Sequence, residues 1–143
     1  MTRIAFAFAL TAFALATTAC GPSKEKVSVT GTPASPATDG TIEVVPHPDF
    51  GNASISIALT NVTPPDRLDS TARFFVVWQK IGTAYAQVGQ LKYDAGSEDK
   101  KATFEGSVLS GPFELVITAE ANSHPQMPSQ HMLLMKQMHG QGE

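Results

Sequence analysis

Cysteine is nearly absent from this chain, since Cys20 is the only one among 143 residues. No disulfide bond can therefore form within the chain. Basic residues are also scarce: 10 lysines and arginines stand against 13 aspartates and glutamates, which gives a net charge of -3. Nucleic-acid binding needs clustered lysine and arginine, so this balance argues against a nucleic-acid partner. The length allows a single folded domain.

The usual catalytic motifs are missing as well. The sequence contains no Gly-x-Ser-x-Gly, no His-Glu-x-x-His and no glycine-rich phosphate loop. The four histidines lie at position 47 or beyond position 123, away from any nucleophile motif. Two pairs of carboxylates, Asp66 with Asp69 and Glu98 with Asp99, fall in polar turns that are typical of solvated loops. We therefore expect a protein that is not an enzyme and that uses no catalytic cofactor.

Long apolar runs are limited to one, residues 4–15, which follow Arg3 and precede the small residues Thr18 and Ala19. A positive residue, an apolar core of about 7 to 15 residues and a small-residue cleavage point are the features of a secretory leader. The run is shorter than the roughly 20 residues that span a bilayer. The sequence therefore predicts export and no transmembrane helix.

The end of this leader, Thr18-Ala19-Cys20, resembles the lipobox of bacterial lipoproteins, although Thr17 stands where that motif usually has leucine. The resemblance implies that residues 1–19 are a signal peptide, and that Cys20 carries a diacylglyceryl group and a further acyl chain such as palmitate. Two or more acyl chains attach a protein stably to a membrane. Because Gly21 is not the aspartate that retains lipoproteins in the inner membrane, the family's sorting rule implies the outer membrane, facing the periplasm. The alternative is a plain secretory signal with an unmodified Cys20.

Residues 20–40 are rich in proline, glycine, serine and threonine, with Val27 and Val29 as their only large apolar side chains. This composition predicts a flexible linker that starts at the lipidated cysteine and holds the domain about 25 Å from the lipid on average. Residues 138–143 end in Gly-Gln-Gly-Glu and are predicted to be a disordered tail. The folded domain is expected to cover residues 41–137.

The rest of the chain has the pattern of β-strands. Ile55, Ile57 and Leu59 alternate with small or polar residues, which indicates a strand with one buried face. Residues 73–79 are apolar on both faces, as in a central strand that is covered on both sides. The other expected strands are residues 42–45, 85–93, 102–108, 113–119 and 131–136. About seven short strands predict an all-β fold, an antiparallel immunoglobulin-like sandwich, with a small β-barrel as the alternative.

The expected core is drawn from the apolar positions of these strands. Its members are Ile55, Ile57, Leu59, Phe75, Val77, Trp78, Val88, Leu91, Phe104, Leu115 and Ile117. If Tyr85 and Tyr93 were exposed instead, they would be candidates for contacts with a partner, because tyrosine is enriched among the residues that dominate interfaces.

Three segments carry a second resemblance: residues 75–78 (Phe-Val-Val-Trp), 88–91 (Val-Gly-Gln-Leu) and 113–120 (Phe-Glu-Leu-Val-Ile-Thr-Ala-Glu), which Pro125 and Pro128 follow. Over residues 72–135 the chain resembles the extracytoplasmic C-terminal domain of anti-sigma-K-type factors. It lacks the transmembrane helix and the sigma-binding module of those factors. The resemblance therefore implies a fold and an envelope setting, and it transfers no catalytic residue.

Methionine and histidine gather near the C-terminus, where every methionine after the leader lies between positions 127 and 138. Thioether and imidazole groups suit copper, so the sequence offers a candidate metal site made of His124, Met127, His131, Met132 and Met135. The alternative is that these methionines fill gaps in the core as flexible hydrophobic side chains.

Two functions follow from these patterns. The first is an envelope lipoprotein, anchored to the membrane through Cys20, whose sandwich is a non-catalytic binding or structural module for an envelope protein partner. The second is a periplasm-facing copper-binding lipoprotein that uses the methionine and histidine cluster.

Overall fold

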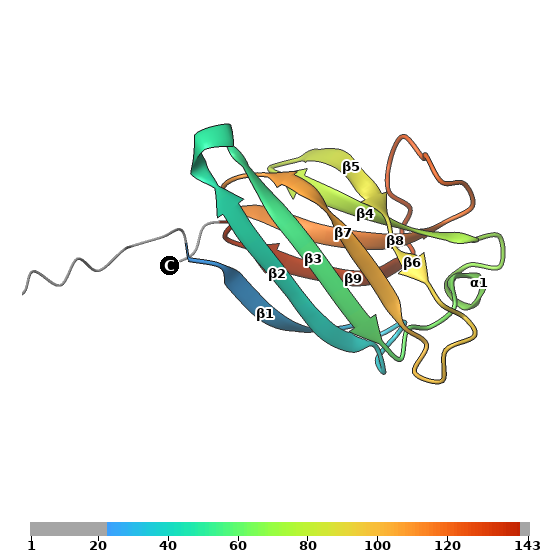
Figure 1. The fold of residues 1–143 in the computed structure, drawn as a ribbon. Helices are drawn as coiled ribbons and strands as arrows, with labels where there is room; N and C mark the ends of the chain where they lie inside the picture. The colour runs from blue at the N-terminus through green and yellow to red at the C-terminus, as the bar shows by residue number, and fades with distance from the viewer. Residues whose placement is uncertain (1–22, 141–143) are drawn as a thin grey trace, which may run out of the picture.

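The computed structural model describes residues 23–140, which form two antiparallel β-sheets packed face to face (Figure 1). One sheet has the strand order β1-β2-β3-β7-β6 and the other has the order β5-β4-β8-β9. If β2, β3, β4 and β5 are read as strands A, B, C and C′, the sheets are A-B-E-D and C′-C-F-G of the immunoglobulin fold, with β1 as an extra strand. The predicted all-β sandwich is confirmed, and the two separate sheets are not a closed barrel.

The elements of the first sheet are β1 (Glu25–Thr30), β2 (Asp39–His47), β3 (Asn52–Thr60), β6 (Lys92–Tyr93) and β7 (Ala102–Leu109). Those of the second are β4 (Phe74–Ile81), β5 (Ala84–Gln90), β8 (Phe113–Glu120) and β9 (Met132–Met138). A 3-10 turn, η1 (Pro48–Phe50), joins β2 to β3, and a short helix, α1 (Pro65–Leu68), lies between β3 and β4.

The predicted strand 85–93 is divided between the two sheets. β5 pairs with β4, whereas β6 pairs with β7 in the other sheet. Leu91 lies at the crossing, where it is buried and its N–H donates to the carbonyl of Phe75 at 3.0 Å. One apolar segment can supply a strand to each sheet in this way, because Leu91 between the two strands keeps a backbone hydrogen bond and stays buried in the core.

The predicted linker at residues 20–40 is wrong from residue 25 onward. Glu25–Thr30 is strand β1, which pairs antiparallel with β2. Val27 and Val29 pack against the core, and Ser35 and Thr38 are fully buried in the following turn, with their hydroxyl oxygens 2.6 Å apart. Two valines at period two give this strand an apolar face despite the prolines around it. The sandwich therefore begins at residue 25 instead of residue 41.

The predicted tail at residues 138–143 also needs correction. Met138 is fully buried as the last residue of β9. The backbone N–H groups of His139 and Gly140 donate to the Glu25 carboxylate at 3.1 and 2.9 Å. Residues 141–143 lie outside the described residues, so the domain extends at least to residue 140.

The main core lies between the sheets and contains most of the expected residues, with Val88 and Phe104 half-buried at its margin. The Phe104 ring packs between Gly89 of β5 and Gly106 of its own strand. A Cβ atom at either glycine would come within 2.5 Å of that ring. These two positions must stay small for Phe104 to fill the space where β5 and β7 approach each other.

Trp78 is buried, but on the opposite side of its sheet from the main core. It forms a second cluster with Val76 and Val116, against which Tyr85 and Met132 pack. Its indole N–H donates to the Thr118 hydroxyl at 2.8 Å, which in turn donates to the Glu120 carboxylate at 2.5 Å. The expectation of a strand covered on both sides is thereby confirmed for residues 75–79, whereas Phe74 is 37% exposed.

Candidate functional site

The predicted lipidation site, Cys20, lies outside the described residues. In residues 23–140, no helix is long and apolar enough to cross a membrane. The position of β1 nevertheless bears on the predicted lipid anchor, because the sandwich begins five residues after Cys20, at Glu25.

His124 and Met127 of the predicted metal site lie exposed in the loop between β8 and β9. The His124 Nδ1 atom contacts the Ser123 hydroxyl at 2.9 Å. His131, at the end of the same loop, has its Nε2 atom 3.7 Å from the Asp69 carboxylate. The two histidines therefore have separate neighbours.

The methionines of β9 are distributed over both faces of their sheet. A β-bulge interrupts the pairing of β8 with β9 between Ile117 and Thr118, so Met132 and Met135 both lie on the outer face. Met132 packs against the Trp78 cluster, Met135 is half exposed, and Met138 is fully buried on the inner face. Within residues 23–140, no three His, Cys, Asp or Glu side chains are grouped so that they could hold a metal ion. Copper binding through the methionines stays a prediction.

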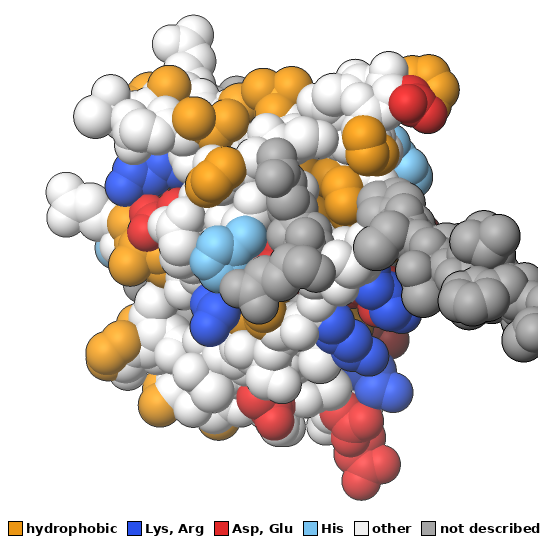
Figure 2. Space-filling view, turned by 90° about the vertical axis from the view of Figure 1, so that its left-hand side faces the viewer, with side chains coloured by type: hydrophobic (Ala, Val, Ile, Leu, Met, Phe, Trp, Pro, Cys, Tyr) orange, Lys and Arg blue, Asp and Glu red, His pale blue; other side chains and the backbone are white. Residues whose placement is uncertain are grey.

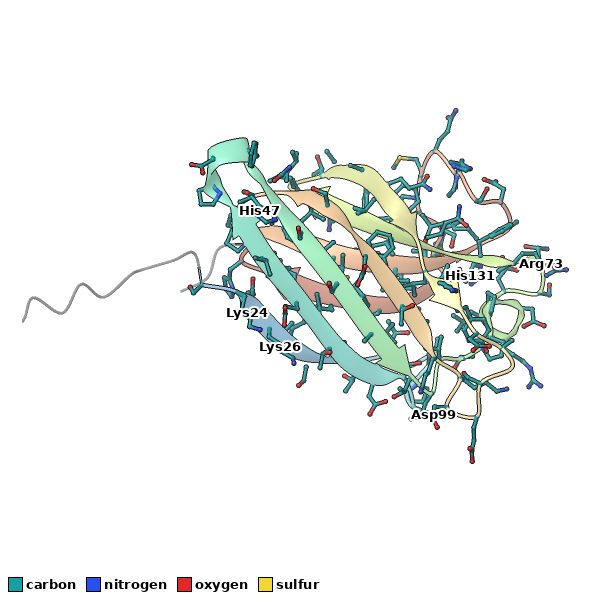
Figure 3. All side chains as sticks on the ribbon, viewed as in Figure 1. Lys24, Lys26, His47, Arg73, Asp99 and His131 are labelled. Atoms are coloured by element: carbon teal, nitrogen blue, oxygen red, sulfur yellow. The ribbon has the colours of Figure 1, made fainter. Side chains whose placement is uncertain are left out.

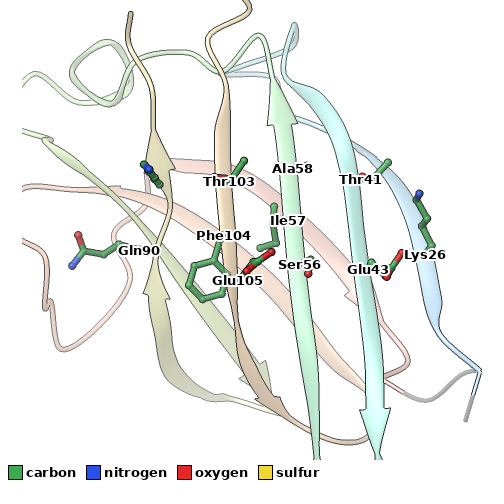
Figure 4. Close-up of a pocket in the computed structure, with 11 residues that line it drawn as sticks. Lys26, Thr41, Glu43, Ser56, Ile57, Ala58, Gln90, Thr103, Phe104 and Glu105 are labelled. Carbon is green, nitrogen blue, oxygen red and sulfur yellow. The ribbon is translucent and has the colours of Figure 1, made fainter. Parts of the chain in front are cut away.

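A shallow hollow of about 660 Å³ lies on the outer face of the five-stranded sheet (Figure 4). The strand register places Lys26, Glu43, Ser56 and Glu105 side by side across β1, β2, β3 and β7. A second row runs parallel to the first, and its members in the hollow are Thr41, Ala58, Thr103 and Lys92. Directly opposed residues of antiparallel strands share a face, so all these side chains line one surface.

Small, polar and charged side chains line most of this hollow, and Ile57 and Phe104 also line it. Glu43 and Glu105 flank Ser56 from two strands that are about 10 Å apart, given the spacing of neighbouring strands. The Lys24 ammonium lies 3.4 Å from the Glu43 carboxylate. The residues that line the hollow include no histidine or cysteine, so Ser56 has no imidazole base beside it there. The arrangement is suited to hydrogen bonds and ion pairs with a polar ligand.

The two tyrosines do not form an exposed aromatic patch. Tyr85 packs edge-on against Trp78 with ring centres 6.4 Å apart, and Tyr93 packs in the same way against Phe75 at 5.7 Å. The most exposed aromatic side chain in the described chain is instead Phe50, in the turn between β2 and β3. An aromatic residue within a Pro-Asp-Phe-Gly turn is the sequence signal that points to it.

No family model, no curated protein and no solved structure matches this chain.

Proposed function

We propose that this chain is a lipid-anchored envelope lipoprotein whose β-sandwich is a non-catalytic binding module. The observation that carries the proposal is the leader, in which Arg3, the apolar residues 4–15 and Thr18-Ala19-Cys20 precede the folded domain. Lipidation gives a role to the single cysteine, which in an exported chain has no partner for an intramolecular disulfide. The sorting rule of that family, applied to Gly21, favours the outer membrane facing the periplasm.

The hollow on the five-stranded sheet supports binding over catalysis. It is open and shallow, and apart from Ile57 and Phe104 its lining residues are small, polar or charged. Sites for small apolar molecules are usually deeper and lined by hydrophobic and aromatic side chains. This surface fits a polar region of a larger envelope component, bound through hydrogen bonds and exposed ion pairs.

The anchor is tested by expressing the full chain beside Cys20→Ser in a Gram-negative host that contains labelled palmitate. We expect the wild-type chain to incorporate label, to lose residues 1–19 and to stay in the membrane fraction after a high-salt wash. Cys20→Ser should carry no label and should be recovered in the soluble fraction. A wild-type chain with an unmodified Cys20 would show that the leader is a plain secretory signal.

The binding surface is tested with a photo-crosslinking amino acid at Thr103, in the hollow, and at Glu98, in the turn between β6 and β7. Both positions are exposed, so the two variants differ in location and not in accessibility. We expect crosslinks to an envelope component from Thr103 that are absent from Glu98 and that weaken in Glu43→Gln/Glu105→Gln. Equal crosslinking from both positions would contradict a site in the hollow.

A further inference from the structure

One end of the sandwich brings together the first described residues, three turns and the last described residues. We name it the anchor end: it consists of residues 23–25, the turns at residues 48–51, 81–84 and 109–112, and residues 138–140. The Ser110 N–H donates to the carbonyl of Gly51 at 3.2 Å, which joins two of the turns. The Glu25 carboxylate accepts the Gly140 N–H at 2.9 Å, which joins the two ends of the described chain.

Further contacts complete this end of the molecule. A Cβ atom at Gly140 would lie 2.2 Å from the carbonyl oxygen of Gly111, so the chain end packs directly on the turn between β7 and β8. The Gln79 amide of β4 donates to the carbonyl of Leu109 at 2.8 Å. In Figure 3, Lys24, Lys26 and His47 lie toward this end, whereas Arg73, Asp99 and His131 lie at the other.

The anchor end carries exposed hydrophobic side chains. Three of the six large hydrophobic side chains that are exposed in residues 23–140 lie there: Phe50 at 81%, Leu109 at 58% and Ile81 at 43%. Leu109 is the register partner of Asn52, next to the turn that holds Phe50. Figure 2 views the molecule from this end and shows several hydrophobic side chains on it. Exposed apolar surface favours transfer from water into another apolar phase, because that transfer lowers the free energy of the system.

The chain length places the lipid near this end. Cys20 precedes the first described residue, Ser23, by three residues, so at full extension its Cα lies within about 10 Å of Ser23. The sandwich is longer than that, because a strand of nine residues such as β3 spans about 30 Å. Acyl chains on Cys20 are therefore close to the anchor end and out of reach of the opposite end, which holds α1.

Two lysines at or next to the anchor end, Lys24 and Lys80, form ion pairs. The Lys24 ammonium lies 3.4 Å from the Glu43 carboxylate, and the Lys80 ammonium lies 3.1 Å from the Glu114 carboxylate. Paired charges contribute little attraction to anionic lipids, in contrast to a polybasic patch. The apolar side chains are the main attraction to lipid, so the surface fits a bilayer of either zwitterionic or anionic headgroups.

We propose that the anchor end docks on the membrane that holds Cys20, with Phe50, Ile81 and Leu109 inserted at the level of the headgroups. This inference rests on the proposed lipidation of Cys20. The lipid is the anchor, and the three side chains set the orientation, with the strands rising from the bilayer and the hollow facing sideways.

The test uses the full chain, matured in the host and reconstituted in vesicles of phosphatidylethanolamine and phosphatidylglycerol. Lipidation occupies the thiol of Cys20, so a single added cysteine becomes the one free thiol. Phe50→Cys and Leu109→Cys report on the anchor end. Met127→Cys is the matched control, because Met127 is also an exposed hydrophobic residue but lies in the loop at the opposite end. Each cysteine carries an environment-sensitive fluorophore, and Trp78 emission confirms that each variant is folded.

We expect the labels at positions 50 and 109 to shift to the blue on reconstitution and to be quenched by lipids with a nitroxide near the headgroup. The emission of the label at position 127 should not change on reconstitution, because this label stays exposed to water. Equal emission at positions 50, 109 and 127 in a lipidated chain overturns the docking and leaves the anchor in place. An intact mass without lipid overturns the proposed anchor and the docking with it.

Discussion

Two polar side chains, Gln79 in the core and Tyr93 at its margin, differ in how their buried polar atoms are satisfied by hydrogen bonds. The Gln79 amide donates to the carbonyl of Leu109 at 2.8 Å and accepts the N–H of the same residue at 2.9 Å, which connects β4 of one sheet to β7 of the other. The Tyr93 hydroxyl is buried and has no hydrogen-bond partner among the described residues. A buried polar group without a partner costs free energy, whereas a satisfied one fixes the geometry around it.

Tyr93→Phe should stabilise the protein. The change keeps the ring packed on Phe75 and removes the unpartnered hydroxyl, so the free energy of unfolding should rise by about 1 kcal/mol at neutral pH. Burial raises the pKa of Tyr93 above its ordinary value of 10.0, and Asp66 and Asp94 add to the shift. Since the folded state then holds this proton more tightly than the unfolded state, wild-type stability falls as the pH rises through and above 10.0.

Urea unfolding of both proteins at neutral pH and above pH 10.0 measures these effects. The advantage of the phenylalanine variant should be larger in the alkaline series. A variant less stable than wild type at neutral pH would mean that the hydroxyl has a partner in solution, such as an ordered water.

Gln79→Leu should destabilise the protein by about 2 kcal/mol, because the part-buried N–H and carbonyl groups of Leu109 lose their side-chain partner. Gln90→Leu is the matched control, since its amide makes only an exposed hydrogen bond to Ser123 at 3.3 Å. The comparison is made from the free energies of unfolding. An equal decrease in the free energy of unfolding in the two variants would show that the hydrogen bonds of Gln79 between the sheets contribute no more than an exposed one.

At the scale of the strands, the first and last strands are joined through one carboxylate. Glu25 of β1 accepts hydrogen bonds from the backbone of His139 and Gly140, directly after β9, and its side chain is only 11% exposed. The other end of β1 is tied to β9 as well, because the Thr32 N–H donates to the carbonyl of Leu133 at 3.0 Å. β1 thus belongs to one sheet by pairing and is fastened to the other at both ends.

Glu25→Ala should release the C-terminal end of the described chain. Hydrogen bonds to a charged acceptor contribute about 1.5 to 3 kcal/mol, so amides 138–140 should exchange faster with deuterium while β3 and β8 keep their protection. Glu43→Ala is the control, because its pair with Lys24 is exposed and contributes about 0 to 1 kcal/mol. The same exchange pattern in both variants would contradict the role of Glu25.

At the scale of the whole molecule, β1 is part of the folded domain and not of a linker that precedes it. A chain that starts at residue 41 loses β1 and the first residues of β2, which leaves Ile42 and Val44 at an unprotected edge. We expect that chain to unfold at lower temperature and to aggregate, whereas a chain that starts at residue 21 should unfold in one cooperative transition. Calorimetry of the two chains decides the matter, and equal transitions would show that β1 is dispensable.

The fold could be predicted because the alternation of apolar with small or polar residues in a strand is visible in the sequence, as at Ile55, Ile57 and Leu59. Strand β1 could not be predicted, because only two valines mark its apolar face and the prolines and glycines around them are typical of a linker. Residues 73–79 are apolar on both sides, so the pattern could not decide which side of β4 faces the main core, and Trp78 lies on the other one.

The candidate site was harder to predict from the sequence than the fold. The row Lys26, Glu43, Ser56 and Glu105 draws on four strands, and only the register between those strands brings its members together. The exposed side chain of Phe50 depends on a turn that holds it away from the core. Such placements follow from tertiary structure and not from a local pattern.

The meeting of the two ends of the described chain at Glu25 determines where the molecule tolerates an addition. Under the proposed lipidation of Cys20, a reporter fused directly after Gly140 would lie beside the lipid and compete with the bilayer for the same space. Neighbouring ends also make the sandwich a natural subject for circular permutation, in which a short linker closes the old termini and new ones open in the turn at residues 94–101. In that permuted chain a lipidated cysteine could be placed at the opposite end, which would invert the domain relative to the membrane in the orientation we propose.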